Sequence, residues 1–208
     1  MTPARARGLN VHTVATATHS SEPSDKRERI LDAALSLFAE RGFHGTPVPL
    51  VAERAGVGAG TIYRYFASKE ALVNALYRRW KMAFIDGVSA DFPVEKTTRA
   101  QWSHVFRRAV DFAQKNPQAF DFLELHHHAP YLDDESRALE NRVLTLAQSI
   151  LGASRILKAT RDEDPALLIS LVWGGLIQLI RCARQGMLDL SPAVLDRFEL
   201  LTWEALRA

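Results

Sequence analysis

Residues 56–72 read GVGAGTIYRYFASKEAL. Three glycines at alternate positions, Gly56, Gly58 and Gly60, are followed by two tyrosines, an arginine and a lysine. A run of this kind can cradle the phosphates of a nucleotide cofactor, or it can form the turn between two short helices that meet the phosphates of a nucleic acid. The flanking sequence decides between these two interpretations.

The flanking sequence is helical and lacks the residues that a nucleotide loop requires. A dinucleotide fingerprint needs a preceding β-strand, and a P-loop needs Gly-Lys-Ser/Thr. Here Thr46, a good N-cap, stands before Pro47, which suits a first helical position, so a short helix is predicted over about 48–55. A second short helix is predicted over 59–66. Two short helices joined by a tight turn at Gly56 form a helix-turn-helix, here at about 48–66.

The rest of the chain also shows helical periodicity. Before the glycines, Ile30, Ala34, Leu37 and Phe38 recur at the 3.6-residue period of an amphipathic helix that starts near Asp25. We find no convincing strand and no internal repeat, so the predicted fold class is all-α. A helix capped by Ser68 is predicted over 69–87, and five more, bounded by prolines, over about 98–115, 118–128, 134–158, 165–186 and 192–206.

Composition limits the class of protein. The 208 residues, 47% hydrophobic and 24% charged, are typical of a globular protein. The single cysteine, Cys182, excludes an internal disulfide and a Cys-based zinc site, and it fits a reducing cytoplasm. No apolar run reaches the roughly 18 residues of a membrane span. The nearest, Ala166–Ile180, is interpreted as a buried helix, so a cytoplasmic protein without a membrane segment is expected.

The N-terminal part differs in charge from the remainder. Residues 1–80 hold 11 Lys and Arg against 7 Asp and Glu, while residues 81–208 hold 15 against 17. This asymmetry favours an anionic partner for the first part. Residues 1–24 have no periodicity and are predicted to be a disordered basic arm. Their Arg, Ser and Thr content also resembles a transit peptide faintly.

One longer stretch carries a family resemblance. Residues 27–72, RERILDAALSLFAERGFHGTPVPLVAERAGVGAGTIYRYFASKEAL, resemble the DNA-binding domain of the TetR/AcrR family of bacterial transcriptional regulators. The resemblance covers about Asp25–Tyr77, with LFAERGF, VAERAGV and GTIYRYFASKEAL in the family's order and spacing. It implies an N-terminal three-helix DNA-binding domain over 25–72. It also implies a C-terminal helical bundle for ligand binding and dimerisation over 73–208.

The resemblance also implies the DNA-contacting residues. This chain has Gly58 and Ala59 where the family often has a hydroxyl residue and a second polar residue, so Arg64, which can read guanine bidentately, is expected to carry more of the discrimination. Taken alone, Tyr63 or Tyr65 would more often be packing than DNA contact. Phosphate contacts are implied at Thr46, Thr61, Tyr65 and Lys69, and base or groove contacts near Gly60, Tyr63 and Arg64.

The last two predicted helices are the candidates for a dimer interface. One helix-turn-helix reads only a few base pairs, so two modules on paired half-sites are expected. The segment 165–186 is apolar nearly all round and contains Gly174-Gly175, and the family dimerises through a four-helix bundle of these two helices. A core confined to one chain is the alternative. In 192–206 the expected interface stripe is Leu195, Phe198, Leu201/Thr202 and Ala205/Leu206.

The middle of the chain is expected to enclose a small-molecule pocket, as the resemblance implies. His126–His128 also raise the possibility of a metal-dependent enzyme or metal sensor. Three consecutive histidines point about 100° apart on a helix, so they cannot all bind one metal. Glu124 with His128, or His127 with Tyr131 if the helix persists, share a face by i,i+4 spacing, and a site would need a further ligand such as Asp133 or Asp134. No metal or cofactor is predicted. The candidate pocket residues are Phe106, Phe122, Leu125, His128 and Trp173.

The function expected from these features is that of a ligand-responsive repressor with no catalytic residue. A small molecule bound in the body releases the protein from a palindromic operator, acting through the helix 69–87. The sequence leaves activation open as an alternative to repression. The metal-dependent enzyme or sensor, using His126–His128 and the neighbouring acids, is one alternative from another class. A binding protein whose helix-turn-helix mainly packs or binds protein is a second.

Overall fold

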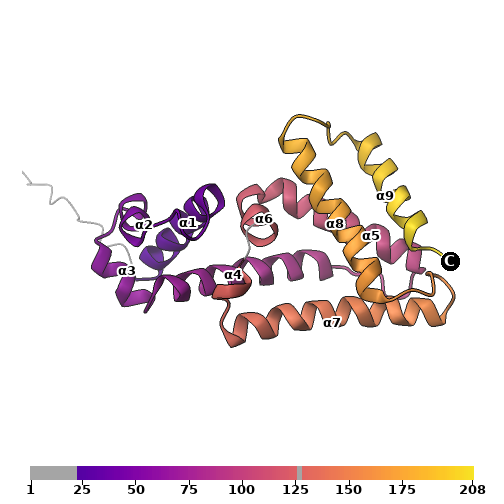
Figure 1. Ribbon diagram of the computed structural model, residues 1–208, viewed down its shortest axis with the longest axis horizontal. Helices are drawn as coiled ribbons and strands as arrows, with labels where there is room; N and C mark the ends of the chain where they lie inside the picture. The colour runs from indigo at the N-terminus through magenta and orange to yellow at the C-terminus, as the bar shows by residue number, and fades with distance from the viewer. Residues whose placement is uncertain (1–22, 126–127) are drawn as a thin grey trace, which may run out of the picture.

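Helices form nearly all of the regular structure in residues 23–125 and 128–208, the part that the computed structural model describes (Figure 1). The strand-type pairing among those residues is an isolated bridge between Thr160 and Arg207. The all-α prediction is confirmed. The helices are α1 (Pro23–Arg41), α2 (Val48–Ala55), α3 (Ala59–Tyr65), α4 (Lys69–Ser89), α5 (Thr98–Lys115), α6 (Pro117–Glu124), the short 3₁₀ helix η1 (Ala129–Tyr131), α7 (Asp134–Ile156), α8 (Pro165–Arg184) and α9 (Pro192–Leu206).

Two predicted boundaries are wrong. Helix α6 ends at Glu124, four residues earlier than expected, and His128 instead caps η1. The N-cap of α2 is Pro47 and not Thr46. The predicted basic arm, residues 1–24, lies outside the described residues except for its last two, which begin α1.

The first three helices enclose a small core of their own. Ile30 and Phe38 of α1, Val51 of α2 and Ile62 of α3 are all almost completely buried. Short helices such as α2 and α3 are not stable alone, so this burial is what holds them in place. Leu72 and Leu76 from the start of α4 close the same core.

The turn of the helix-turn-helix depends on Gly56 and Arg29. Gly56 has φ +65°, a left-handed conformation that glycine adopts without steric cost. The guanidinium of Arg29 on α1 donates to the carbonyl oxygens of Ala55 (2.6 Å) and Gly56 (3.0 Å). These bonds satisfy the otherwise unpaired carbonyls at the end of α2, and they tie the turn to α1.

Helix α4 connects the helix-turn-helix to the body (Figure 1). Its N-cap is Ser68, as predicted, whose hydroxyl accepts a hydrogen bond from the backbone N–H of Ala71 (3.1 Å). At 1.5 Å per residue, its 21 residues span roughly 32 Å. A displacement at one end of this helix is therefore transmitted to the other.

The body is formed by α5 to α9 around aromatic side chains. Phe106 of α5 stacks on Phe198 of α9, with ring centroids 6.0 Å apart. The buried carboxylate of Glu199 pairs with Arg99 and Arg107 of α5, which fixes α9 on α5. Most of the α9 stripe expected at a dimer interface thus packs inside the chain: Leu195, Phe198, Thr202, Ala205 and Leu206 are buried or half-buried, whereas Leu201 is exposed.

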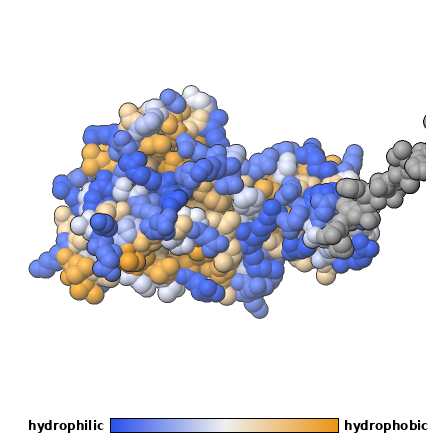
Figure 2. Space-filling model, turned by 180° about the vertical axis from the view of Figure 1, so that it is seen from behind, coloured by the Kyte–Doolittle hydropathy of each residue, from blue (hydrophilic) through white to orange (hydrophobic). Residues whose placement is uncertain are grey.

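Helix α8 is long and apolar enough to cross a membrane by length and composition, with a mean hydropathy of 1.8. The apolar run still ends at Ile180, before Arg181, as expected from the sequence, but the interpretation of this segment as a buried helix is wrong. Only 28% of the window is buried within the chain. Gly175 lies against Phe198 of α9, while Leu167, Leu171 and Gly174 are exposed. Helix α8 consequently presents an apolar face outward, and Figure 2 shows hydrophobic patches over the body.

Replacement of Gly56 by alanine is expected to destabilise the protein. An L-residue in the left-handed conformation costs about 1–2 kcal/mol, and the new Cβ would lie 3.3 Å from the Nη2 of Arg29. Chemical unfolding of the Gly56→Ala variant measures this loss of free energy.

The matched control is Gly60→Ala in α3. An added Cβ there meets no atom within 4 Å, and alanine favours a helix over glycine by about 0.5 kcal/mol. Gly60→Ala should therefore unfold at the same or a slightly higher denaturant concentration. Equal destabilisation by both variants would contradict this account of the turn.

Candidate DNA-binding surface and effector cavity

Helix α3 presents the predicted recognition residues on its outer side. Tyr63 is 55% exposed, and Arg64 is also exposed, while Ile62 between Thr61 and Tyr63 points into the core. Thr61 and Tyr65 are half-buried. One side of a two-turn helix therefore anchors it, and the other offers hydroxyl, phenol and guanidinium groups to a partner.

The N-terminal end of α3 has small residues and no side-chain cap. Its N-cap is Gly58, which provides no side-chain cap, and Gly60 has open space where a Cβ would be. Backbone N–H groups at this end can approach a phosphate closely. The guanidinium of Arg64 lies 5.4 Å from the ring centroid of Tyr65, within the range of a cation–π interaction with this half-buried ring.

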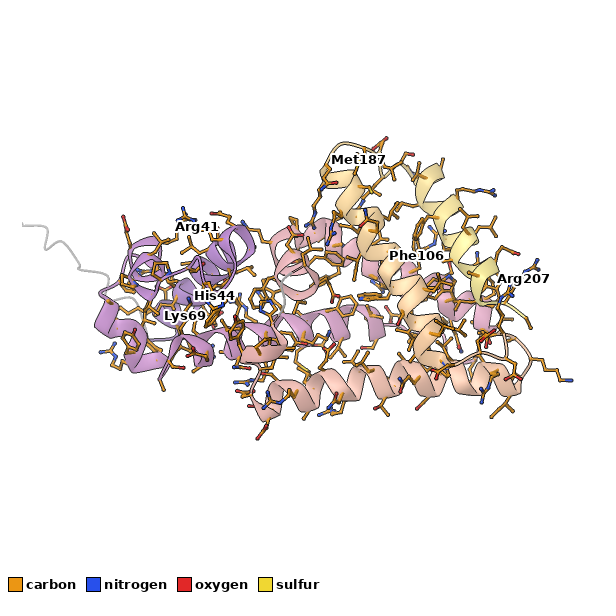
Figure 3. All side chains as sticks on the ribbon, in the orientation of Figure 1. Arg41, His44, Lys69, Phe106, Met187 and Arg207 are labelled. Carbon is orange, nitrogen blue, oxygen red and sulfur yellow. The ribbon has the colours of Figure 1, made fainter. Side chains whose placement is uncertain are left out.

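Lys69, at the start of α4, lies against the loop after α1 (Figure 3). Its ammonium group is 4.1 Å from the ring centroid of Phe43 and donates a hydrogen bond to the Phe43 carbonyl. Burial lowers the pKa of Lys69, and the charge of Glu70 opposes this effect. Phe43 in turn stacks on Tyr131 of η1 at 3.9 Å, and the Tyr131 hydroxyl lies 2.7 Å from Nε2 of His44. Lys69 therefore lies where the helix-turn-helix meets the body.

Thr46 has a different role from the one predicted. The residue is 0% exposed, and its hydroxyl lies 2.8 Å from the carbonyl oxygen of Gly42 and 3.1 Å from that of Leu37. A hydroxyl buried in this way cannot reach a phosphate. Thr46 instead closes the last turn of α1 and positions the start of α2.

The body contains a cavity of about 160 Å³ between α5, α7, α8 and α9. It lies at the end of the molecule remote from the helix-turn-helix, near the C-terminus (Figure 1). Its wall is largely aromatic and aliphatic, and includes Phe92, Trp102, Ile150, Val172, Trp173 and Trp203.

Of the five predicted pocket residues, Trp173 lines this cavity. Phe106 is buried beside it between Trp102 and Phe198, and Phe122 is in the core next to Phe38. Leu125 caps α6 away from the cavity. Periodicity alone marks core and cavity residues identically, which explains these misses. Trp102 and Trp203 were missed for the same reason.

The histidine cluster does not form a metal site within the described chain. His126 and His127 lie outside the residues that the structure describes. The ring of His128 is buried, with Nε2 at the Phe122 carbonyl and its ring centroid 4.3 Å from that of Phe122. Because α6 ends at Glu124, the expected i,i+4 pairing of Glu124 with His128 is lost. No group of three or more His, Cys, Asp or Glu among the described residues could hold a metal ion.

A partly buried polar network connects the cavity wall to α4, and the sequence did not reveal it. The indole N–H of Trp173 donates to the carboxylate of Glu124 at 3.0 Å. Glu124 lies within the electrostatic reach of Lys81 and Glu140, which form an ion pair of 2.7 Å. The hydroxyl of Tyr77 donates to the same Glu140 carboxylate. These charged residues are far apart in the sequence, and each one alone would be interpreted as part of a solvent-exposed helix face. Only the packing of α4, α6, α7 and α8 brings them together.

Comparisons with known proteins agree on one family. The family model described as bacterial regulatory proteins of the tetR family matches residues 30–76. The model described as tetracyclin repressor-like, C-terminal domain, matches residues 78–208. The HTH-type transcriptional regulator RutR of Escherichia coli K12 is 31% identical over 190 residues, which cover 86% of this chain and 81% of RutR.

Solved structures share the fold. A TetR family transcription regulator from Marinobacter aquaeolei superimposes with a TM-score of 0.78 at 22% identity, covering 88% of this chain and 96% of that one. The regulator FadR from Bacillus subtilis, in complex with stearoyl-CoA, gives a TM-score of 0.67 at 22% identity, covering 86% and 98%. At these identities the similarity establishes the fold.

Thr46→Val is expected to reduce stability by about 1–3 kcal/mol, because it leaves buried carbonyl groups without their hydroxyl donor. Thr61→Val is the matched control. The Thr61 side chain is half-exposed, so its loss should change stability by less than about 0.5 kcal/mol. Urea unfolding compares the two variants. A larger loss at Thr61 than at Thr46 would refute the structural role of Thr46.

Glu124→Gln is expected to change the pH dependence of stability. Burial raises the pKa of Glu124 above its ordinary value of 4.5, against the lowering effects of Lys81 and of the Trp173 hydrogen bond. The folded state therefore binds this proton more tightly, and the wild type loses stability as pH rises from 4.5 through the raised pKa.

The glutamine oxygen still accepts from Trp173 but carries no charge, so the Glu124→Gln variant should not show that loss. Urea unfolding between pH 4.5 and 7.5 measures the difference, with the exposed Glu95→Gln as a control that keeps the wild-type profile. A variant with an unchanged pH profile would show that Glu124 is not held in this buried state.

Proposed function

The chain belongs to the TetR family of bacterial transcriptional regulators, and from that membership we propose that it is a homodimeric repressor released from a palindromic operator by a small molecule. Family membership makes it a DNA-binding regulator and not an enzyme. One observation supports this proposal most directly. Helix α4 begins at the DNA-binding end with Lys69, and Phe92, three residues after its end, lines the cavity.

The DNA contacts that we propose come from α3 and the start of α4. Tyr63 and Arg64 face outward for base edges in the major groove, with Gly60 allowing close approach. Thr61 and Tyr65 provide hydroxyl groups for phosphates. Lys69 can add a phosphate contact through its remaining N–H bonds, because one of the three is donated to Phe43.

The dimer that we propose is formed by the outward faces of α8 and α9. Leu171 on α8 is 56% exposed and Leu201 on α9 is 52% exposed, and Gly174 offers open space for a second backbone. An apolar surface of this kind on a single chain is typical of a protein–protein interface. A C₂ dimer through these helices would present two copies of α3 to two half-sites.

The effector would act by changing the spacing of these two copies of α3. A molecule in the cavity presses on Phe92 and Trp173, which reach α4 through the chain itself and through the Glu124, Lys81 and Glu140 network. A coupling of about 1–3 kcal/mol suffices for a usable switch. The complex of FadR with stearoyl-CoA supports a small-molecule effector for a protein of this fold.

Selection from a random duplex library at two salt concentrations tests the DNA-binding proposal. The expected result is an inverted repeat whose affinity falls steeply as salt rises, because phosphate contacts release counterions. Arg64→Ala should relax the preference at one position of each half-site. A sequence without two-fold symmetry, or no enriched sequence even at low salt, would contradict the proposal.

Leu171→Arg and Leu201→Arg are each expected to yield a monomer, because they bury a charge in the proposed interface. The monomers should bind the selected operator at least about tenfold more weakly, since the two half-sites are no longer linked. Light scattering after size exclusion gives the mass, and fluorescence anisotropy gives the affinity.

Leu146→Arg on α7 is the matched control, because Leu146 is 61% exposed but belongs to another face. It should remain dimeric and bind the operator normally. Dissociation by Leu146→Arg, with the other two variants still dimeric, would place the interface on α7 instead.

A further inference from the structure

The ammonium group of Lys69 is held in place by a neighbouring aromatic residue. A lysine side chain is long and flexible, and it loses conformational freedom when its ammonium group is fixed on a phosphate. Here the ammonium group is fixed before any partner binds, because it lies 4.1 Å from the ring centroid of Phe43 and donates to the Phe43 carbonyl. Lys69 is nevertheless only half-buried, so its remaining N–H bonds can reach a partner. Whatever places Phe43 therefore also places Lys69.

The ring of Phe43 is placed by an aromatic side chain from the body. Phe43 lies in the segment between α1 and α2, and its ring stacks on that of Tyr131 in η1, with centroids 3.9 Å apart and planes 16° from parallel. The Tyr131 hydroxyl lies 2.7 Å from Nε2 of His44, so the same tyrosine contacts two neighbouring residues of this segment. Stacked aromatic pairs gain attraction beyond the area that they bury. Tyr131 therefore fixes the segment that provides the Phe43 ring and carbonyl.

Tyr131 is in turn tied to α4, the helix that begins with Lys69. The side-chain amide of Asn74, which is 2% exposed, donates to the Tyr131 carbonyl at 2.7 Å. Its oxygen accepts from the backbone N–H of Asp133 at 2.9 Å. A buried amide that is hydrogen-bonded at both ends leaves η1 little freedom to move relative to α4. The contacts thus form a closed ring that runs from α4 through η1 and the segment between α1 and α2 back to α4.

Resting on the proposed function, in which Lys69 contacts a phosphate, we propose that Tyr131 is a positioning residue for DNA binding. Its ring holds Phe43 so that the Lys69 ammonium group is preorganised for the DNA backbone. A residue of the body thereby takes part in DNA binding without touching DNA itself. A lysine that is held in advance loses less freedom on binding than one that is free in solution. Loss of the Tyr131 ring should therefore weaken DNA binding through Lys69 and through no other contact.

A double-mutant cycle between Tyr131 and Lys69 tests this route in the full-length protein, by anisotropy with the selected operator. Lys69→Met removes the charge and keeps the length of the side chain. Because each neutralised phosphate contributes about 0.9 to the slope of log affinity against log salt, loss of both lysines of a dimer should make the slope shallower by up to about 1.8. Tyr131→Ala should weaken binding at least about threefold in the wild type, but less than about 1.5-fold in the Lys69→Met background, because residues that act together are not additive.

Two further variants separate positioning from a general loss of structure. Tyr131→Phe keeps the stacked ring and loses only the contact with His44, so it should bind DNA within about 1.5-fold of the wild type. His104→Ala is the matched control, because it also removes a half-buried ring, one that bonds to the Val88 carbonyl near the opposite end of α4. It should bind DNA as the wild type does. Urea unfolding of each variant establishes that it is folded under the conditions of the binding assay.

The outcomes distinguish this inference from the proposed function. Weakening by Tyr131→Ala that disappears in the Lys69→Met background, with normal binding by Tyr131→Phe, would support both. Equal weakening by Tyr131→Ala in the two backgrounds, or a Tyr131→Phe variant as weak as Tyr131→Ala, would overturn the positioning role while the phosphate contact of Lys69 stands. An unchanged salt slope in Lys69→Met would overturn the contact and the inference, and leave operator binding intact. A wild-type protein that selects no operator would contradict the proposed function and the inference together.

Discussion

Helix α4 runs through one continuous hydrophobic core that joins the helix-turn-helix to the body, and the arrangement of the molecule depends on that continuity. Leu72 and Leu76 of α4 are buried at the helix-turn-helix end of this core, while Tyr77, Lys81 and Phe84 are buried against the body. Because an α-helix is stiff over this length and the core is close-packed, neither end can shift without moving the other. One continuous helix is therefore sufficient to couple the remote cavity to the DNA-binding surface.

The DNA-binding end shows how a few buried groups place the exposed ones. Arg29 and Gly56 set the angle between α2 and α3, and Thr46 holds the segment before α2. With these contacts made, Ile62 faces inward and Tyr63 and Arg64 must face outward. The outward residues contribute little to folding, so they are available to contact a partner.

The body combines exposed apolar surface with a partly buried group of charges. Leu167 and Leu171 lie exposed on α8, whereas the buried Lys81 pairs with the half-buried Glu140 and lies close to the half-buried Glu124. Buried charges add little net stability, but breaking such a group is costly. A network that joins α4, α6, α7 and α8 therefore makes certain relative positions of these helices much more favourable than others, as a two-state regulator requires.

The helices could be predicted from the sequence because they depend on local signals: apolar periodicity, the caps at Ser68 and Gly56, and prolines at helix boundaries. The DNA contacts assigned to α3 and to the start of α4 stay predictions. The predictions that concern three-dimensional neighbourhood were less accurate. Thr46 proved to be buried, Phe106, Phe122, Leu125 and His128 proved to lie outside the cavity, and most of the α9 stripe packs within the chain. The type of a side chain, apolar or polar, does not reveal which helix it will pack against. Only the packing of α4 to α9 decided which tryptophans enclose a cavity and which acids become buried.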